Sequence, residues 1–83
     1  MIEVINAKYI EDYRIWLEFN DGTSGIADLS GELWGRMFEP LRDVNAFKKF
    51  VVSDTMKTIS WDNGADLAPE FLYNKVKNKH IEV

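Results

Sequence analysis

The sequence predicts a small α+β domain in which an antiparallel sheet is covered on one face by short helices. Two observations support this prediction. The first third of the 83-residue chain alternates apolar and polar residues with the period of two that strands show, whereas the middle third changes to helical spacing. The last third then returns to short strands before one final helix. The expected order is β-β-β-α-α-β-β-α in a single domain, residues 1–83, because a chain of this length cannot bury two separate cores.

The opening strands have the clearest pattern. Alternation begins at Ile2 and Val4 and is lost near residues 6–7. In the next strand the apolar face carries Tyr13, Ile15, Leu17 and Phe19, and the opposite face carries Arg14, Trp16 and Glu18. Asp21-Gly22 follows, and these two residue types tolerate the positive φ that a tight turn requires. We therefore expect a hairpin in which residues 13–19 pair with residues 23–28.

The middle third is expected to contain two short helices. Its apolar residues have helical spacing within residues 29–38, and the two glycines of this segment predict that the first helix is short or partly 3₁₀. Pro40 is expected to end it, because the residue before a proline is disfavoured in the α region. Asp43 is typical of an N-cap and predicts a second helix over residues 44–50.

Two strands and a helix are expected in the last third. Residues 51–53 and 58–61 have strand character and flank a turn at residues 54–57. Pro69 is favoured at the first position of a helix, and Glu70 then faces the positive end of the helix dipole. The basic residues expected at or beyond the negative end are Lys75, Lys77 and Lys79.

Composition and charge exclude several classes of protein. There are no cysteines, so disulfide scaffolds and cysteine-ligated zinc sites are excluded. Fourteen acidic residues against ten basic ones give a net charge of −4, which argues against direct binding to nucleic acid. No apolar run approaches the ~20 residues of a membrane span, and the first residues show no basic-then-apolar signal. We expect a cytoplasmic protein with no cofactor, no metal and no membrane contact.

The absence of common catalytic motifs from the sequence favours a non-catalytic role. The sequence contains no G-x-S-x-G, no G-x-G-x-x-G and no phosphate-binding P-loop. His80 is the only histidine, and a lone histidine without a cysteine or serine partner forms neither a triad nor a metal site. The alternative function is a small enzyme or metal-dependent site that uses Asp28, Asp66 and Glu70, since paired carboxylates transfer protons when their environments separate their pKa values.

The three tryptophans are candidate anchors of a core or an interface. Trp61 is expected to be buried at the base of the last helix, and Trp34 to be half-buried in the first helix. Trp16 lies on the strand face opposite the apolar row, between Arg14 and Glu18. It either packs on its own sheet or belongs to a protein interface, where tryptophan and arginine are enriched. The predicted binding residues are therefore Arg14, Trp16, Glu18 and Trp34.

Four blocks of sequence resemble a family of small bacterial domains of unknown function. The longest block, residues 61–73, is similar to the family's W-x-N-G-A-D, x-P-E and L-Y pattern. Residues 17–22 resemble its L-x-F-x-D-G hairpin, residues 28–29 its D-L pair, and residues 38–43 its F-x-P-L-R-D turn. The resemblance extends over nearly the whole chain.

The resemblance implies an α+β fold and no established activity. Some members of the family carry an additional C-terminal helix-turn-helix domain, and others are encoded beside short proteins in arrangements that look like toxin–antitoxin pairs. It therefore implies a regulatory or antitoxin-like module that binds protein. The expected partner is another protein or a second copy of this chain, held at the exposed face of the sheet.

A structural role is expected for the residues of the longest block that match the family's pattern. These residues are Trp61, Asn63, Gly64, Asp66, Pro69, Glu70 and Tyr73. Asp66 is expected to cap the helix that begins at Pro69, because Ala68 has no side chain that can accept a hydrogen bond. The open alternative is that this segment orients a ligand or a cation.

Overall fold

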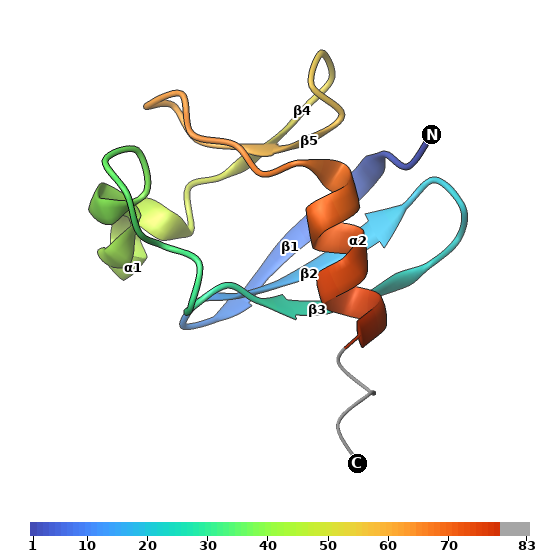
Figure 1. Cartoon of the computed structure of the whole chain (residues 1–83), viewed down its shortest axis with the longest axis horizontal. Coiled ribbons are helices and arrows are strands. Elements are labelled where there is room, and N and C mark those ends of the chain that lie inside the picture. Colours follow the sequence, from blue (N-terminus) through green and yellow to red (C-terminus); the bar gives the residue numbers. More distant parts are fainter. Residues whose placement is uncertain (79–83) are drawn as a thin grey trace.

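The computed structural model describes residues 1–78, and the expectations for Lys79 and His80 lie outside this range. Its elements follow the predicted order of three strands, two short helices, two strands and a final helix (Figure 1). The strands form a three-stranded antiparallel sheet in the order β1-β2-β3 and a two-stranded sheet, β4-β5. The predicted α+β class is confirmed.

The central hairpin has the predicted register. β2 (Arg14–Phe19) pairs with β3 (Ser24–Asp28), so that Arg14 lies opposite Asp28. The turn between the strands contains Gly22 at φ +90°, a conformation that glycine adopts without the steric cost of a Cβ atom. The apolar row of β2 is buried and its opposite face is partly exposed, as the alternation predicts.

β1 (Val4–Glu11) is longer than the sequence predicts because two irregularities interrupt its alternation. Its pairing with β2 shifts register between Val4 and Asn6 and again between Tyr9 and Glu11. A bulge places an extra residue in one strand, which reverses the side-chain alternation beyond it. The period of two is therefore lost near residues 6–7 although the strand continues.

The helix predicted within residues 29–38 is wrong. This segment forms turns and bends, with Gly35 at φ +88°, and a 3₁₀ helix, η1 (Glu39–Arg42), follows it. Pro40 lies in the first turn of η1 instead of ending a helix, because a proline loses no hydrogen bond at that position. Trp34 is consequently 68% exposed, which corrects the expectation that it is half-buried.

The next helix begins as predicted and ends early. α1 (Val44–Phe47) is shorter than the predicted span of residues 44–50. Its N-cap is Asp43, whose carboxylate accepts a hydrogen bond from the Asn45 N–H at 3.0 Å. The capping signal was therefore reliable, whereas the apolar spacing that followed it did not extend the helix.

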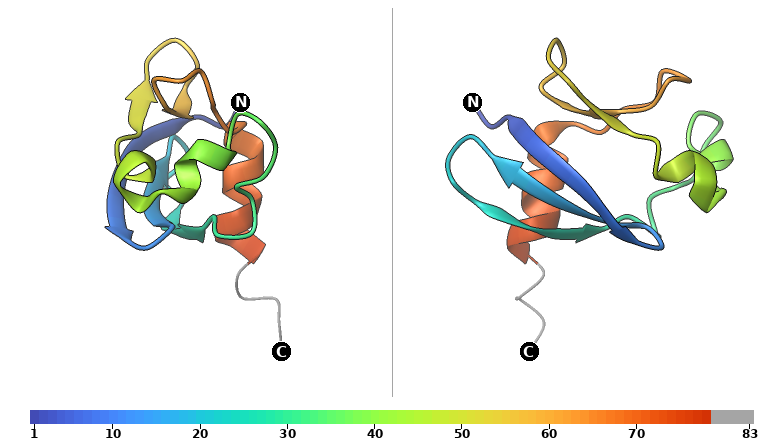
Figure 2. Two further views of the ribbon diagram at one scale, coloured as in Figure 1. Left: turned by 90° about the vertical axis from the view of Figure 1, so that its left-hand side faces the viewer. Right: turned by 180° about the vertical axis from the view of Figure 1, so that it is seen from behind.

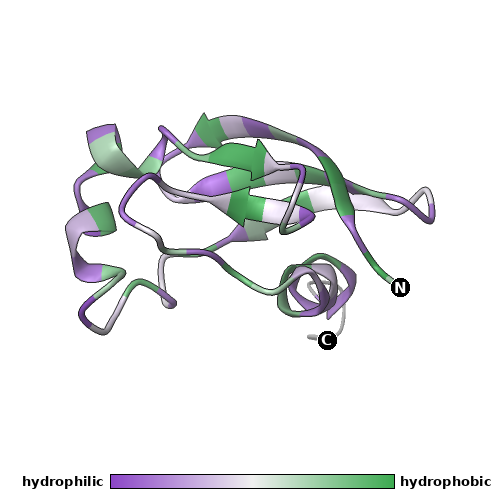
Figure 3. Cartoon of the chain, turned by 90° about the horizontal axis from the view of Figure 1, so that it is seen from above, coloured by the Kyte–Doolittle hydropathy of each residue, from purple (hydrophilic) through white to green (hydrophobic). Residues whose placement is uncertain are grey.

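The last three elements are a second hairpin and the helix that covers one face of the large sheet. β4 (Val51–Ser53) and β5 (Thr58–Ser60) form the predicted second hairpin, and α2 (Pro69–Asn78) begins at the predicted proline. α2 crosses the three-stranded sheet, and its C-terminal turn projects past β3 (Figures 1 and 2). Seen end-on, α2 lies on one side of the strands (Figure 3). From behind, the other face of the sheet is turned to the viewer with α2 beyond it (Figure 2).

Aromatic side chains join the sheet to the elements beside it. The ring of Phe47 lies 5.2 Å from that of Tyr13 and 5.8 Å from that of Trp61, measured between centroids. Trp61 is 5% exposed, and its indole N–H donates to the Phe47 carbonyl at 2.7 Å, so it anchors the core as predicted. None of the helices in residues 1–78 has the length and apolar character needed to cross a membrane.

Candidate functional site

The most distinctive stretch of the sequence forms a structural turn. Gly64 has φ +94°, its N–H donates to the Trp61 carbonyl at 3.0 Å, and the Trp61 N–H donates to the Ala65 carbonyl at 2.9 Å. Asn63 ties this turn to the loop before η1. Its amide nitrogen donates to the Met37 carbonyl at 2.9 Å, and its amide oxygen accepts from the Ala65 N–H at 3.0 Å. The Asn63 side chain and these backbone groups of the turn are therefore engaged within the fold.

Asp66 does not cap α2, contrary to the expectation from sequence. The first helical hydrogen bond runs from the Leu72 N–H to the Ala68 carbonyl at 3.2 Å, which makes Ala68 the N-cap. Asp66 lies two residues earlier, in an isolated bridge with Ser60. This bridge holds Asp66 beside β5, and its carboxylate accepts no hydrogen bond from residues 1–78.

The four blocks that resemble the family, residues 17–22, 28–29, 38–43 and 61–73, are called the signature blocks below, and others of them also make internal contacts. Asp21 accepts hydrogen bonds from the Tyr73 hydroxyl at 2.7 Å and from the Thr23 N–H at 2.9 Å, which ties the β2–β3 turn to α2. These two donors, Tyr73 first, hold the pKa of Asp21 below its ordinary value of 3.8. Arg42 donates from Nε to the Leu33 carbonyl at 2.6 Å and so fixes the loop before η1. The hydrogen bonds made by these blocks therefore account for the fold more directly than for a function.

The three carboxylates of the alternative enzyme lie on different elements. Asp28 ends β3, Asp66 bridges to β5, and Glu70 lies in the first turn of α2. Within the described part of the chain, no hydrogen bond or ion pair joins any two of them. Residues 1–78 also contain no group of three or more histidine, cysteine, aspartate or glutamate side chains placed to hold a metal ion. No observed contact brings these three acids together.

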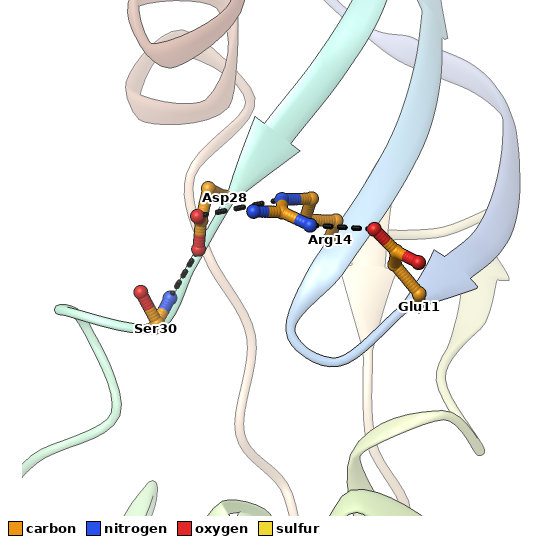
Figure 4. Close-up of polar contacts among 4 residues, drawn as sticks. All are labelled: Glu11, Arg14, Asp28 and Ser30. Carbon is orange, nitrogen blue, oxygen red and sulfur yellow. Dashed lines mark hydrogen bonds and ion pairs between the residues drawn. The ribbon is translucent and has the colours of Figure 1, made fainter.

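Asp28 belongs instead to an ion-pair network at the end of the hairpin (Figure 4). Arg14 Nη1 lies 2.6 Å from Glu11 Oε2, and Arg14 Nε lies 3.6 Å from Asp28 Oδ2. The Ser30 N–H donates to Asp28 Oδ1 at 3.0 Å. This hydrogen bond, assisted by the charges of Arg14 and Lys75, holds the pKa of Asp28 below its ordinary value of 3.8. At neutral pH the carboxylate is therefore ionised and positions the guanidinium.

Three hollows that share lining residues lie beside this network, and we call them together the corner groove. The largest, about 540 Å³, lies between β3 and α2 and is lined by Arg14, Ile26, Asp28, Phe71, Asn74, Lys75 and Asn78. The next, about 250 Å³, shares Arg14 and Asp28 with it and adds Asp12, Tyr13 and Ser30. The last, about 270 Å³, shares Tyr13 and Ser30 with that one and adds Gly31, Leu33, Trp34 and Arg42. The corner groove thus extends from α2 to Trp34.

The corner groove contains two of the four predicted binding residues. Arg14 lines the first two hollows, and Trp34 lines the far end. Trp16 and Glu18 lie outside it, on the outer face of β2. Trp16 is half-buried there, with Lys8 Nζ 5.7 Å from its ring centroid. The structure therefore divides the predicted residues between two neighbouring surfaces.

The sequence did not predict that α2 forms a wall of the corner groove. Phe71, Asn74 and Asn78 lie on one flank of the helix, beside the buried stripe of Leu72 and Val76. A weak signal was present, because Phe71 is a large apolar residue outside that stripe. Helical spacing alone does not show which strand this flank faces, so the groove became visible only in three dimensions.

Comparison with known proteins identifies a family. The model of a family described as "Protein of unknown function (DUF2442)" matches residues 4–78. The matched range begins with the first residue of β1 and ends with the last residue of α2, so it covers every described helix and strand. No curated protein and no solved structure matches the chain.

Proposed function

Because the chain belongs to the DUF2442 family, whose description assigns no function, we propose one from its surface: it is a non-catalytic module that binds another protein through the corner groove. Trp34 carries this proposal. Apart from Met1, it has the highest exposed fraction of the large apolar side chains in residues 1–78, and it borders a groove. An exposed tryptophan beside a cleft gains free energy when a partner buries it, and tryptophan is enriched among residues that dominate binding.

The make-up of the corner groove supports a protein partner. Its apolar and aromatic lining includes Tyr13, Trp34 and Phe71, which is the composition found at the centre of interfaces. Ion pairs border this lining: Arg14 contacts acidic neighbours, and Lys75 Nζ lies 2.8 Å from Glu32 Oε2. Paired charges around an apolar centre match the polar rim of an interface.

The outer face of β2 extends the proposed contact. Trp16 and Glu18 lie on this face, and Lys8 covers part of the Trp16 ring. We assign them to the margin of the interface, because a half-buried ring has less area left to bury than the exposed Trp34. The proposed partner is a short protein encoded beside this chain, with this chain as the regulatory or antitoxin-like member of the pair. The resemblance of the signature blocks supports this assignment.

The test is a binding measurement with the protein encoded next to this chain in its native host. Trp34→Ala is expected to weaken binding by roughly 2 kcal/mol or more and to leave the free energy of unfolding within about 0.5 kcal/mol, since the side chain is exposed. Met56→Ala is the matched control, because Met56 is 50% exposed and lies in the β4–β5 turn, away from the groove. Isothermal titration calorimetry and thermal melting report the two quantities.

Two results would contradict the proposal. Equal binding by Trp34→Ala and the unmodified chain would place the contact elsewhere. Equal weakening by Trp34→Ala and Met56→Ala would show a general effect on the protein and not a defined surface.

A further inference from the structure

We propose that the outer edge of β3, which pairs with no other strand within residues 1–78, binds an extended, basic segment of a partner protein, which adds to the sheet as a fourth strand inside the corner groove. This inference rests on the proposed function and names the form of the partner. It concerns the end of the corner groove opposite to Trp34, between β3 and α2. Strand addition to a sheet edge is a general mode of peptide recognition, in which backbone hydrogen bonds provide affinity and side-chain pockets provide selectivity.

The pairing of β2 with β3 determines which backbone groups of β3 are free. The Leu29 N–H donates to the Tyr13 carbonyl at 2.9 Å, and the Phe19 N–H donates to the Thr23 carbonyl at 2.8 Å. In an antiparallel pair, hydrogen-bonded and non-hydrogen-bonded positions alternate. Residues 25 and 27 therefore bond to β2, whereas the N–H and C=O groups of residues 24, 26 and 28 point away from it.

These free groups lie at the groove. Ile26 and Asp28 line the hollow of about 540 Å³ whose other wall is the flank of α2 that carries Phe71 and Asn74. No backbone hydrogen bond among the described residues occupies the outward groups of Ile26 or Asp28. In the proposed complex, the added chain lies in this hollow, between the strand and the helix. Its alternate side chains would then contact Phe71.

β3 lacks three of the features that protect sheet edges from pairing. Proteins blunt such edges with bulges, prolines and lysines. The outer strand on the other side, β1, has two register shifts, and its Val4 N–H is taken by the Lys57 carbonyl at 3.0 Å. β3 has an unbroken register with β2, and its sequence, Ser-Gly-Ile-Ala-Asp, contains neither lysine nor proline. Of the two edges of the three-stranded sheet, the edge of β3 is therefore the one suited to an added strand.

Charge selects a basic segment over a second copy of this chain. Among the residues that the structure describes, four acidic side chains lie around the part of the groove that contains Asp28, namely Glu11, Asp12, Asp28 and Glu32, together with two basic ones, Arg14 and Lys75. Both basic groups are already paired with acids from this set. The whole chain carries a net charge of −4, so two copies would bring like charges together. A lysine or arginine near one end of the added strand would complement this excess.

The experiment selects short random peptides, displayed on an unstructured carrier, against the full chain. Enriched peptides are expected to have β-branched or aromatic residues in the centre and lysine or arginine at one end. A selected peptide is then synthesised with a single backbone N-methyl group at each position in turn. Methylation at every second position is expected to weaken binding at least about tenfold, while the positions between tolerate it, because only alternate amides of an edge strand face β3.

Two variants of this chain give a matched comparison. Ile26→Pro removes the outward N–H without touching the bonds to β2, and an edge strand accepts proline at such a position. Ile26→Ala removes the same side chain and keeps the N–H. We expect Ile26→Pro to bind the selected peptide at least about tenfold more weakly than Ile26→Ala. In the unmodified chain, hydrogen exchange at the Ile26 and Asp28 amides is expected to slow when the peptide is bound.

Other outcomes would overturn the inference. Failure to enrich any peptide, enrichment of acidic peptides, or an N-methyl scan without a period of two would each contradict it. Dimerisation of the chain alone in sedimentation equilibrium, abolished by Ile26→Pro, would assign the edge to a second copy. If Trp34→Ala no longer binds the protein encoded next to this chain while Ile26→Pro still binds it, the proposed function stands and strand addition is wrong. If Trp34→Ala has no effect, the proposed function itself fails.

Discussion

Asn63 and Asp66 lie three residues apart in the same short segment and have different roles. Asn63 makes two hydrogen bonds that join the turn after β5 to the loop before η1. Asp66 pairs through its backbone with Ser60, and its carboxylate makes no hydrogen bond within residues 1–78. An Asn side chain that folds back on its own backbone needs only local geometry. A cap also needs the helix axis to lie in the right direction, which sequence spacing does not specify.

At the residue scale, Asn63→Ala is therefore expected to lower the free energy of unfolding by about 1–3 kcal/mol, because two hydrogen bonds are lost. Asp66→Ala serves as its control and is expected to change this free energy by less than about 0.5 kcal/mol. Urea unfolding followed by tryptophan fluorescence measures both variants. A loss in Asp66→Ala as large as that in Asn63→Ala would restore the capping role.

At the scale of elements, α2 approaches the sheet at a position of β3 that has no side chain. A Cβ atom built on Gly25 would lie 2.7 Å from Val76 Cγ1, closer than two carbon atoms can approach. Val76 is buried in the stripe by which α2 contacts the sheet, and a valine in a helix has little rotamer freedom to move aside. The glycine therefore sets the distance between β3 and α2, and with it the width of the corner groove.

Gly25→Ala tests this contact. It is expected to destabilise the fold by about 1–3 kcal/mol through overpacking. Val76→Ala alone also destabilises the fold, because it removes two buried methyl groups. The double variant, Gly25→Ala with Val76→Ala, is expected to lose less free energy of unfolding than the two single variants lose together. The expected difference is about 0.5–3 kcal/mol, since the shorter side chain at residue 76 makes room for the added methyl group. Chemical denaturation of the four proteins measures these free energies of unfolding. Additive losses would show that the side chains at the two sites are not in steric conflict.

At the scale of the whole molecule, two aspartates make the stability of the fold depend on pH. Asp21 joins the β2–β3 turn to α2 through Tyr73, and Asp28 joins the end of the hairpin to the following loop through the Ser30 N–H. The pKa of each carboxyl is lowered in the folded protein. A lowered pKa means that the folded state favours the ionised form, so each group contributes stability above its ordinary value of 3.8. That contribution is lost as the pH falls through the folded pKa.

The melting temperature of the chain is accordingly expected to fall when the pH drops below about 4. Asp28→Asn removes one of these two carboxyl groups, and Tyr73→Phe removes the hydrogen bond that contributes most to the lowered pKa of Asp21. Each variant is expected to melt below the unmodified chain at pH 6, and the difference is expected to narrow below pH 3.8. Thermal melting between pH 2 and pH 7 measures this. A difference that stays constant with pH would show that these carboxylates do not couple proton binding to folding.

The sequence by itself determined the features that depend on neighbouring residues. The alternation of residues 13–19, the Asp21-Gly22 turn, the Asp43 cap and the start of α2 at Pro69 are each encoded within a few positions, because strand period, turn conformation and helix ends are local properties. Two of the predicted binding residues, Arg14 and Trp34, also line the corner groove.

Only the tertiary structure decided how these elements meet. Residues 29–38 have helical spacing, but Gly35 and the contacts of the loop with Arg42 and Asn63 hold the chain in turns and leave Trp34 exposed. The corner groove joins β3 to α2, whose sequences are some forty residues apart, and its position depends on the angle at which the helix crosses the sheet. Packing between distant side chains sets that angle, and no periodicity within either segment records it.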